Sequence, residues 1–188
     1  GKKEPEIFIN ESFPSLMRHL KQFESKAKKR DDQGDYWWEL RHCAYYPEFE
    51  KEKVVWQRIT HEPTFCLVEP NVLILDSMAF FTGNNLKFIM ALLNSKLIFK
   101  YVEMIVHQYG FTGFRLSNQY VEMMPLPPIT TENQPIVNQI EALVDKIITV
   151  KKQNPQSDTT NLEREIDNLV YKLYDLNEEE IKIIENGR

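Results

Sequence analysis

Apolar side chains recur at the spacing of an α-helix in the first thirty residues. A helix from about residue 13 to 30 would carry one apolar face, formed by Leu16, Leu20, Phe23 and Ala27. Ser12 can cap this helix, and Pro14 falls in its first turn, where proline is tolerated. The acidic, glycine-containing run at 31–35 then ends it. We therefore predict one amphipathic N-terminal helix.

The pattern changes between residues 36 and 81, where β-branched and aromatic residues gather in short runs. These runs are typical of strands and lie at 53–56, 65–68, 72–75 and 78–81. Turn-forming residues separate them, namely Pro63, Pro70, Asn71, Gly83 and Asn84. The spacing predicts a small, mostly antiparallel sheet.

Helical spacing returns at residue 85 and predicts helices at 85–94 and 96–107. A loop with two glycines and two aromatic residues follows at 110–115, and then a short helix at 119–124. The prolines within 125–128 cannot continue a helix and favour extended backbone. We therefore expect a stiff hinge at that point.

Beyond the hinge, apolar residues recur at helical spacing over 134–152 and 159–174. The segment between these two helices is short enough for an antiparallel hairpin. A last helix opens at Asn177, with acidic residues at its positive end. The predicted fold class is α+β: a small, mostly antiparallel sheet domain with packed helices, followed by a C-terminal helical hairpin or bundle.

The composition is ordinary for a globular protein, with 42% hydrophobic and 27% charged residues in 188. No apolar run approaches the roughly 20 residues that span a bilayer, and the first residues lack the apolar core of a signal peptide. We therefore expect a cytoplasmic protein without a membrane partner. The start at Gly1 rather than at methionine leads us to expect part of a longer protein.

The net charge of −5 is unevenly distributed along the chain. Residues 1–30 carry eight basic and four acidic side chains, whereas 31–125 carry eight basic and twelve acidic ones. Residues 126–188 carry seven basic and twelve acidic side chains. The acidic surplus therefore lies largely in the C-terminal helices, and a basic surface elsewhere stays possible. Charge alone does not argue for DNA binding.

Catalytic motifs are missing from the sequence. The two cysteines and four scattered histidines show no metal-ligand spacing, and the six glycines form no phosphate-binding loop. The pair Pro127-Pro128 lacks the asparagine and tyrosine of the turn that holds the target amine in amino-methyltransferases. The acid-x-lysine spacing of metal-dependent nucleases occurs at 24–26 and 180–182, inside predicted helices, where positions i and i+2 do not converge. We therefore expect no catalytic activity, metal or cofactor in this chain.

Several strings nevertheless resemble the TaqI-like C-terminal specificity domain. Its start is similar to YWWELR (36–41) and FEKEKVVW (49–56), and its central part to LLNSK (92–96), GFRLSNQYVE (113–122) and PLP (125–127). Its closing helices are similar to LEREIDNLVYKLY (162–174) and LNEEEI (176–181). Each string alone is weak, but their order and spacing are specific.

The resemblance implies a target-recognition domain of bacterial single-chain enzymes that both cut and methylate DNA. In such enzymes an upstream domain binds S-adenosylmethionine and methylates adenine, and a nuclease domain, which uses a divalent metal, lies further upstream. The implied partners are double-stranded DNA and the upstream methyltransferase domain. The implied parts of this chain are a connecting helix (1–35), a recognition globule (36–125) and a helical spacer (126–188).

Recognition by such a domain depends on side chains that read base edges in the major groove, while phosphate contacts set the register. The candidates are Arg41, Lys51, Lys53, Arg58, Arg115, Asn118 and Gln119. Arg115 is favoured, because Gly110 and Gly113 would let its loop approach DNA closely and arginine pairs bidentately with guanine. Alternatively, Arg115 pairs with a nearby acid and fastens the loop. Lys51 and Lys53 are interpreted as phosphate contacts or solvated charges.

Two other interpretations stay open. The C-terminal helices, especially 162–174, would mediate protein–protein docking or dimerisation if their apolar stripe were exposed. A hydrolase with an unrecognised site is the third alternative. The three tryptophans, Trp37, Trp38 and Trp56, are interpreted as core residues with a satisfied indole N–H.

Overall fold

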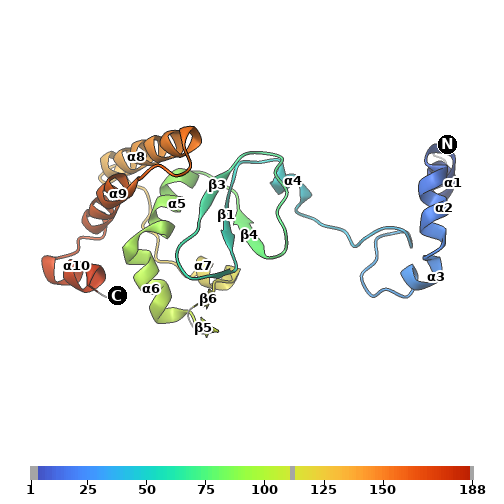
Figure 1. Cartoon of the computed structure of the whole chain (residues 1–188), viewed down its shortest axis with the longest axis horizontal. Helices are drawn as coiled ribbons and strands as arrows, with labels where there is room; N and C mark the ends of the chain where they lie inside the picture. The colour runs from blue at the N-terminus through green and yellow to red at the C-terminus, as the bar shows by residue number, and fades with distance from the viewer. Residues whose placement is uncertain (1–3, 111–112, 187–188) are drawn as a thin grey trace. The chain divides into compact units, whose positions relative to one another are not determined.

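Residues 4–110 and 113–186 are described by the computed structural model, and the backbone divides between Tyr46 and Pro47 into two units (Figure 1). The first unit contains α1 (Pro5–Ser12), α2 (Pro14–Lys21) and α3 (Glu24–Ala27). The second contains the sheets and the remaining helices, apart from α4 (Tyr46–Phe49), which lies at the boundary.

The predicted single helix from 13 to 30 is wrong, because two short helices, α2 and α3, occupy this region and α1 precedes it. The break between α1 and α2 falls at Phe13, whose φ of −137° and ψ of 58° are not helical. Pro14 causes this break, since proline disfavours helical backbone in the residue before it. Within the first unit Met17 is buried, whereas Leu16 and Phe23 of the predicted stripe are each 48% exposed.

Aromatic residues and one arginine organise the rest of the first unit. Tyr36 stacks on Trp38 with ring centroids 4.9 Å apart, and Trp37 meets Trp38 edge-on at 5.5 Å. The guanidinium of Arg30 donates hydrogen bonds to the carbonyl oxygens of Trp37 (3.0 Å) and Glu39 (2.7 Å). Trp37 and Trp38 are half-buried and pack on each other, so the core position predicted for them is not reached.

An antiparallel sheet of order β3-β1-β4 forms the first layer of the second unit. Its strands are β1 (Lys53–Gln57), β3 (Cys66–Val68) and β4 (Met78–Phe81), which confirms three of the four predicted strands. The fourth prediction, at 72–75, is wrong. Leu73 and Leu75 are 69% and 78% exposed there and have no strand partner in the described part of the chain.

A second antiparallel sheet has the order β2-β6-β5. Its strands are β2 (Ile59–Thr60), β5 (Gln108–Tyr109) and β6 (Gly113–Arg115), and α7 (Asn118–Glu122) follows directly. The loop predicted at 110–115 is therefore corrected at 113–115, which form a strand. Residues 111 and 112 of that prediction lie outside the described residues.

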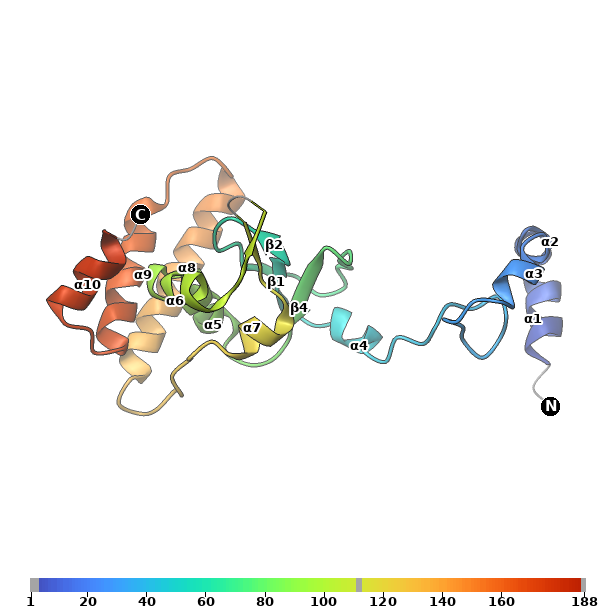
Figure 2. The same cartoon turned by 90° about the horizontal axis from the view of Figure 1, so that it is seen from below.

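The helices predicted beyond residue 85 are confirmed, whereas the predicted cap Ser12 ends α1 and does not cap α2, which begins after Phe13. Besides α7, the confirmed helices are α5 (Leu86–Asn94), α6 (Lys96–Ile105), α8 (Gln134–Gln153), α9 (Thr160–Leu173) and α10 (Glu178–Glu185). Figures 1 and 2 show α5 between the three-stranded sheet and the pair α8–α9. One apolar core extends from Val54 of the sheet through Leu92 of α5 to Ile140 and Val170, all four fully buried. The predicted α+β fold is confirmed.

The C-terminal helices use their apolar stripes inside the chain. Ile166, Val170 and Tyr171 of α9 are buried, so the stripe proposed for docking or dimerisation is already covered. The Tyr174 hydroxyl donates to the Pro125 carbonyl oxygen at 2.9 Å and so ties α9 to the predicted hinge. Burial raises the pKa of Tyr174 to about 12. The division at 35 and 125 stays a prediction.

Candidate nucleic-acid interface

Arg115 is exposed and ends β6, the central strand of the small second sheet. Its partner on β2 is Ile59, whose side chain is 49% exposed. Residues directly opposite each other in an antiparallel pair point to the same face. Arg115 and Ile59 therefore share a solvent-facing surface, on which an arginine is presented by a strand rather than by an unstructured loop.

Two glycines shape the hairpin that carries Arg115. Gly110 adopts a φ of 70°, in the left-handed region that favours glycine. A Cβ at Gly113 would lie 3.1 Å from the Tyr109 carbonyl oxygen, which is closer than most side chains come to backbone. The glycines thus meet the needs of the hairpin backbone, and their use for a close approach to DNA stays a prediction.

Buried contacts fix the backbone around Arg115. The indole N–H of Trp56 donates to the Leu116 carbonyl oxygen at 2.9 Å in the interior, and the Leu116 N–H donates to the Arg58 carbonyl oxygen at 2.8 Å. Phe114 packs edge-on against Phe99, with ring centroids 5.8 Å apart. Residues on both sides of Arg115 are therefore buried and bonded, which holds the exposed arginine at a defined position.

Asn118 and Gln119 follow on the same anchored segment. Both are exposed and form the first turn of α7, which is separated from the buried Leu116 only by the N-cap residue Ser117. Amide side chains at exposed positions can accept and donate at base edges, as the pairing of asparagine or glutamine with adenine requires. The structure thus brings three of the predicted residues together within one short, fixed stretch of chain.

Arg58 joins this region through the backbone. It lies between β1 and β2, and its carbonyl oxygen accepts the Leu116 N–H. Its side chain is 43% exposed, with Nη1 3.6 Å from Oδ1 of the fully exposed Asp76. The Nε atom of Arg58 is buried and has no hydrogen-bond partner among the described residues. An exposed, loosely paired guanidinium of this kind can exchange its carboxylate for another acceptor at little cost.

Lys51 and Lys53 bond to other groups of the second unit. Lys53 is fully buried, and its ammonium donates to the Glu69 carbonyl oxygen at 3.1 Å, so in this conformation it does not face solvent. Lys51 is exposed and donates to Glu48 at 2.6 Å. That bond, together with one from the Thr82 hydroxyl, lowers the pKa of Glu48. Arg41 belongs to the first unit, 3.8 Å from Asp32.

The alternative role of Arg115, fastening its loop, requires an acidic partner. No carboxylate pairs with Arg115 within residues 4–110 and 113–186, so the alternative that it fastens the loop to an acid finds no partner there. Its DNA-reading role stays a prediction.

Sequence reasoning missed the exposed side chains of β5. Tyr109 is 52% exposed and pairs with Gly113, while Gln108 is exposed and pairs with Phe114. These residues were overlooked because the segment was expected to end a helix and enter a loop. The aromatic residue directly before Gly110 was the available signal for a hairpin.

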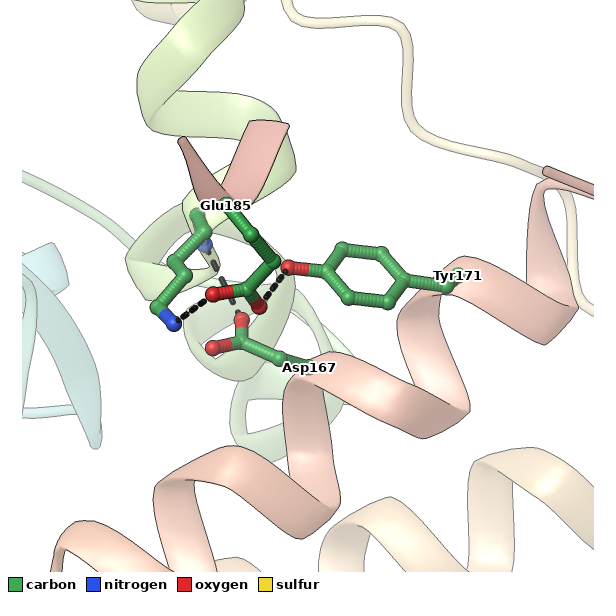
Figure 3. Close-up of polar contacts among 4 residues, drawn as sticks. Asp167, Tyr171 and Glu185 are labelled. Atoms are coloured by element: carbon green, nitrogen blue, oxygen red, sulfur yellow. Dashed lines mark hydrogen bonds and ion pairs between the residues drawn. The ribbon is translucent and has the colours of Figure 1, made fainter. Parts of the chain in front are cut away.

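A separate polar cluster links the start of α6 to α9 and α10 (Figure 3). The backbone N–H of Lys96 donates to the Asp167 carboxylate at 3.0 Å, and the Lys96 ammonium donates to Glu185 at 2.6 Å. Glu185 also accepts the Tyr171 hydroxyl at 2.8 Å. These bonds join the three helices, so the cluster holds α10 in place against α6 and α9.

The pKa values in this cluster shift in opposite directions. Burial raises the pKa of Asp167, against the bond from the Lys96 N–H. Burial and the bond to Glu185 raise the pKa of Tyr171 well above its usual value. Hydrogen bonds from Lys96 and Tyr171 lower the pKa of Glu185 despite some burial. Desolvation therefore outweighs the favourable contacts of ionised Asp167, whereas the hydrogen bonds to Glu185 outweigh its smaller desolvation penalty.

Replacing Asp167 with asparagine should stabilise the chain at pH 7. The folded-state pKa of Asp167 is raised, so its contribution to stability is fully present below the unfolded pKa and is lost as the pH rises through the folded pKa. Asparagine keeps an acceptor for the Lys96 N–H without the charge. We expect the free energy of unfolding to be higher for Asp167→Asn than for the wild type at pH 7 and equal near pH 3, in urea unfolding measured across this range. If the free energy of unfolding of the wild type and of Asp167→Asn depended on pH in the same way, this prediction would be wrong.

The described residues lack the features of two other classes of protein. No helix among residues 4–110 and 113–186 is long and apolar enough to cross a membrane. In the same part of the chain, no three histidine, cysteine or acidic side chains gather in a way that could hold a metal ion.

Comparison with known proteins identifies a matching family. The family model of the TaqI-like C-terminal specificity domain matches residues 9–126, which is well over half of the chain. The matched stretch contains both sheets, α5 to α7 and all of the predicted DNA-reading residues. No curated protein matches the chain in a sequence search.

Proposed function

Because this chain belongs to the family of TaqI-like C-terminal specificity domains, we propose that it selects a double-stranded DNA sequence for a restriction–modification enzyme and is not itself the catalyst. The family is one of DNA target recognition. One observation supports the proposal that this chain selects the sequence: Arg115, Asn118 and Gln119 are exposed on a backbone that is fixed by Trp56.

The proposed mechanism divides recognition between two kinds of contact. Arg115 would donate two hydrogen bonds to a guanine, and Asn118 or Gln119 would pair with an adenine, in the major groove. Arg58 would contact a phosphate or a second base after leaving Asp76. A strand and a short helix anchored in the core suit this task, because base readout requires side chains held close to their productive geometry.

The catalytic work is assigned to other domains of the same bacterial, cytoplasmic enzyme. We propose an upstream domain that binds S-adenosylmethionine and methylates adenine, and a nuclease domain that uses a divalent metal. An adenine within a duplex must be flipped out of the stack before it is methylated, at a cost of about a few kcal/mol. A domain that binds only one sequence determines which adenine is offered.

Selection from a random duplex library tests the proposed function. The chain should enrich one short sequence, and binding of that duplex should weaken steeply as salt is raised, because neutralised phosphates release counterions. We expect at least a ~1000-fold preference over a scrambled duplex at physiological salt, measured by fluorescence anisotropy. Enrichment of no sequence by the full-length protein would argue against the proposal.

A further inference from the structure

A cleft of about 920 Å³ lies beside β3, between the end of α5, the start of α6 and the pair α8–α9. Its floor is apolar and consists of Met90, Ala91, Val144, Ile147, Ile148 and Ile166. None of the residues assigned above to DNA recognition lines it. The cleft is therefore a feature that target recognition does not use.

One wall of the cleft is the edge strand of the three-stranded sheet. The order β3-β1-β4 leaves β3 with a partner on one side only, and Figure 1 shows its other side toward α5. The Arg58 N–H donates to the Ser77 carbonyl oxygen at 3.1 Å, continuing the β1–β4 ladder. The backbone N–H and carbonyl groups of successive residues point to opposite sides of a strand. Those of Arg58 and Trp56 therefore point toward β4, and those of Val55 point toward β3.

The same alternation fixes which groups of β3 face the cleft. Val55 pairs with Cys66, so the backbone groups of Phe65 and Leu67 point away from β1. Hydrogen bonds to the Asn94 side chain confirm this at Phe65. The Phe65 N–H donates to the Asn94 side-chain oxygen at 3.1 Å, and the Asn94 side-chain amide donates to the Phe65 carbonyl oxygen at 2.8 Å. Asn94 thus takes the place of a strand partner for Phe65.

Leu67 has no such substitute. Its side chain is half-buried and lines the cleft, and its outward N–H and carbonyl have no hydrogen-bond partner among the described residues. An unpaired donor and acceptor on a strand edge form a template for one more strand. A strand added there would run above Ile147 and Ile148, because both residues line the same cleft.

The charges around the cleft argue against a nucleic acid as its occupant. Lys96 is paired with Glu185 at 2.6 Å, Lys152 with Glu69 at 3.2 Å, and Lys151 donates to the Ser157 carbonyl oxygen at 2.8 Å. Five carboxylates line the cleft in all: Glu52, Glu62, Glu69, Glu163 and Asp167. These acids would repel a phosphate backbone. Three of the four cations that line the cleft are already bonded to groups of the chain, and Arg164 is the fourth.

We propose that this cleft binds an extended segment of a protein partner, which adds to β3 as a further strand. Main-chain hydrogen bonds to Leu67 would supply affinity, and alternate apolar side chains would enter the floor and supply selectivity. Arg115, Asn118 and Gln119 do not line this docking surface, so a partner bound here need not contact the proposed DNA-reading residues.

The first test uses a phage-displayed library of random peptides selected on the chain. We expect enriched peptides with apolar residues at every second position, and slower hydrogen exchange of the Leu67 amide by about ten-fold when the best peptide binds. A selection without any saturably binding peptide, or a bound peptide that leaves the Leu67 amide unchanged, would overturn the proposal.

Two variants separate strand addition from other binding. Leu67→Pro removes the outward N–H, a change that edge strands tolerate, and Ile147→Glu places a charge on the floor. Each should weaken the selected peptide by about ten-fold or more. Ile183→Glu, at a 65% exposed position on α10 outside the cleft, is the matched control and should bind like the wild type. Binding of both cleft variants at wild-type affinity refutes the assigned surface.

Discussion

Replacing Arg115 with alanine should weaken binding of the selected DNA sequence by about ten- to a hundred-fold, because one bidentate arginine–guanine pair is worth about 1–3 kcal/mol of discrimination. The side chain is exposed, and it makes no ion pair in residues 4–110 and 113–186. Its loss therefore leaves no buried charge behind, and the fold should remain unchanged. The measurement is anisotropy with the selected duplex and with a scrambled one.

Arg115→Lys distinguishes base reading from simple charge. Lysine keeps the positive charge but lacks the planar fork that matches guanine. We therefore expect the scrambled duplex to bind as before and the selected duplex to lose most of its advantage. Arg164→Ala, on α9 and outside the matched family region, is the control and should leave both affinities unchanged. If Arg115→Ala bound both duplexes like the wild type, Arg115 would have no part in readout.

The predictions from sequence succeeded where local pattern decides the structure. The helices at 134–152 and 159–174 were found within a residue or two, because their apolar faces are long and regular. The run at 72–75 has the same apolar character as a strand, yet Leu73 and Leu75 are exposed. Whether such a run joins a sheet depends on a partner strand distant in sequence, and that partner is invisible to a local pattern.

The candidate site was predictable only in part, for a related reason. The segment 113–115 was identified, but as part of a loop, since β6 acquires its strand character from β2, more than fifty residues earlier. Lys53 was expected at the surface because lysine is almost never fully buried. In the structure Lys53 lies inside and its ammonium reaches a backbone carbonyl. Burial and strand pairing are therefore the two properties that the sequence did not reveal.

Trp56 connects the stability of the domain with its proposed readout. The ring is buried among Phe65 and Phe81, and its N–H is the only side-chain donor that bonds the Leu116 carbonyl in the described structure. Trp56→Ala should lower the free energy of unfolding by about 3–5 kcal/mol. Trp56→Phe, which keeps a ring but leaves that carbonyl unpaired, should cost about 1–3 kcal/mol. Urea unfolding followed by circular dichroism measures both.

The consequence for DNA binding follows from the place of Leu116, directly after Arg115. Without the indole bond this part of the backbone is held less firmly, so Trp56→Phe should also weaken the selected duplex more than the scrambled one under conditions where it is folded. Trp38→Phe, at a half-buried position of the first unit, is the matched control and should change stability by less than about 1 kcal/mol. A Trp56→Phe protein that is destabilised but reads DNA with full selectivity would show that the anchor serves folding alone, and that Arg115 is positioned by the β2–β6 pairing.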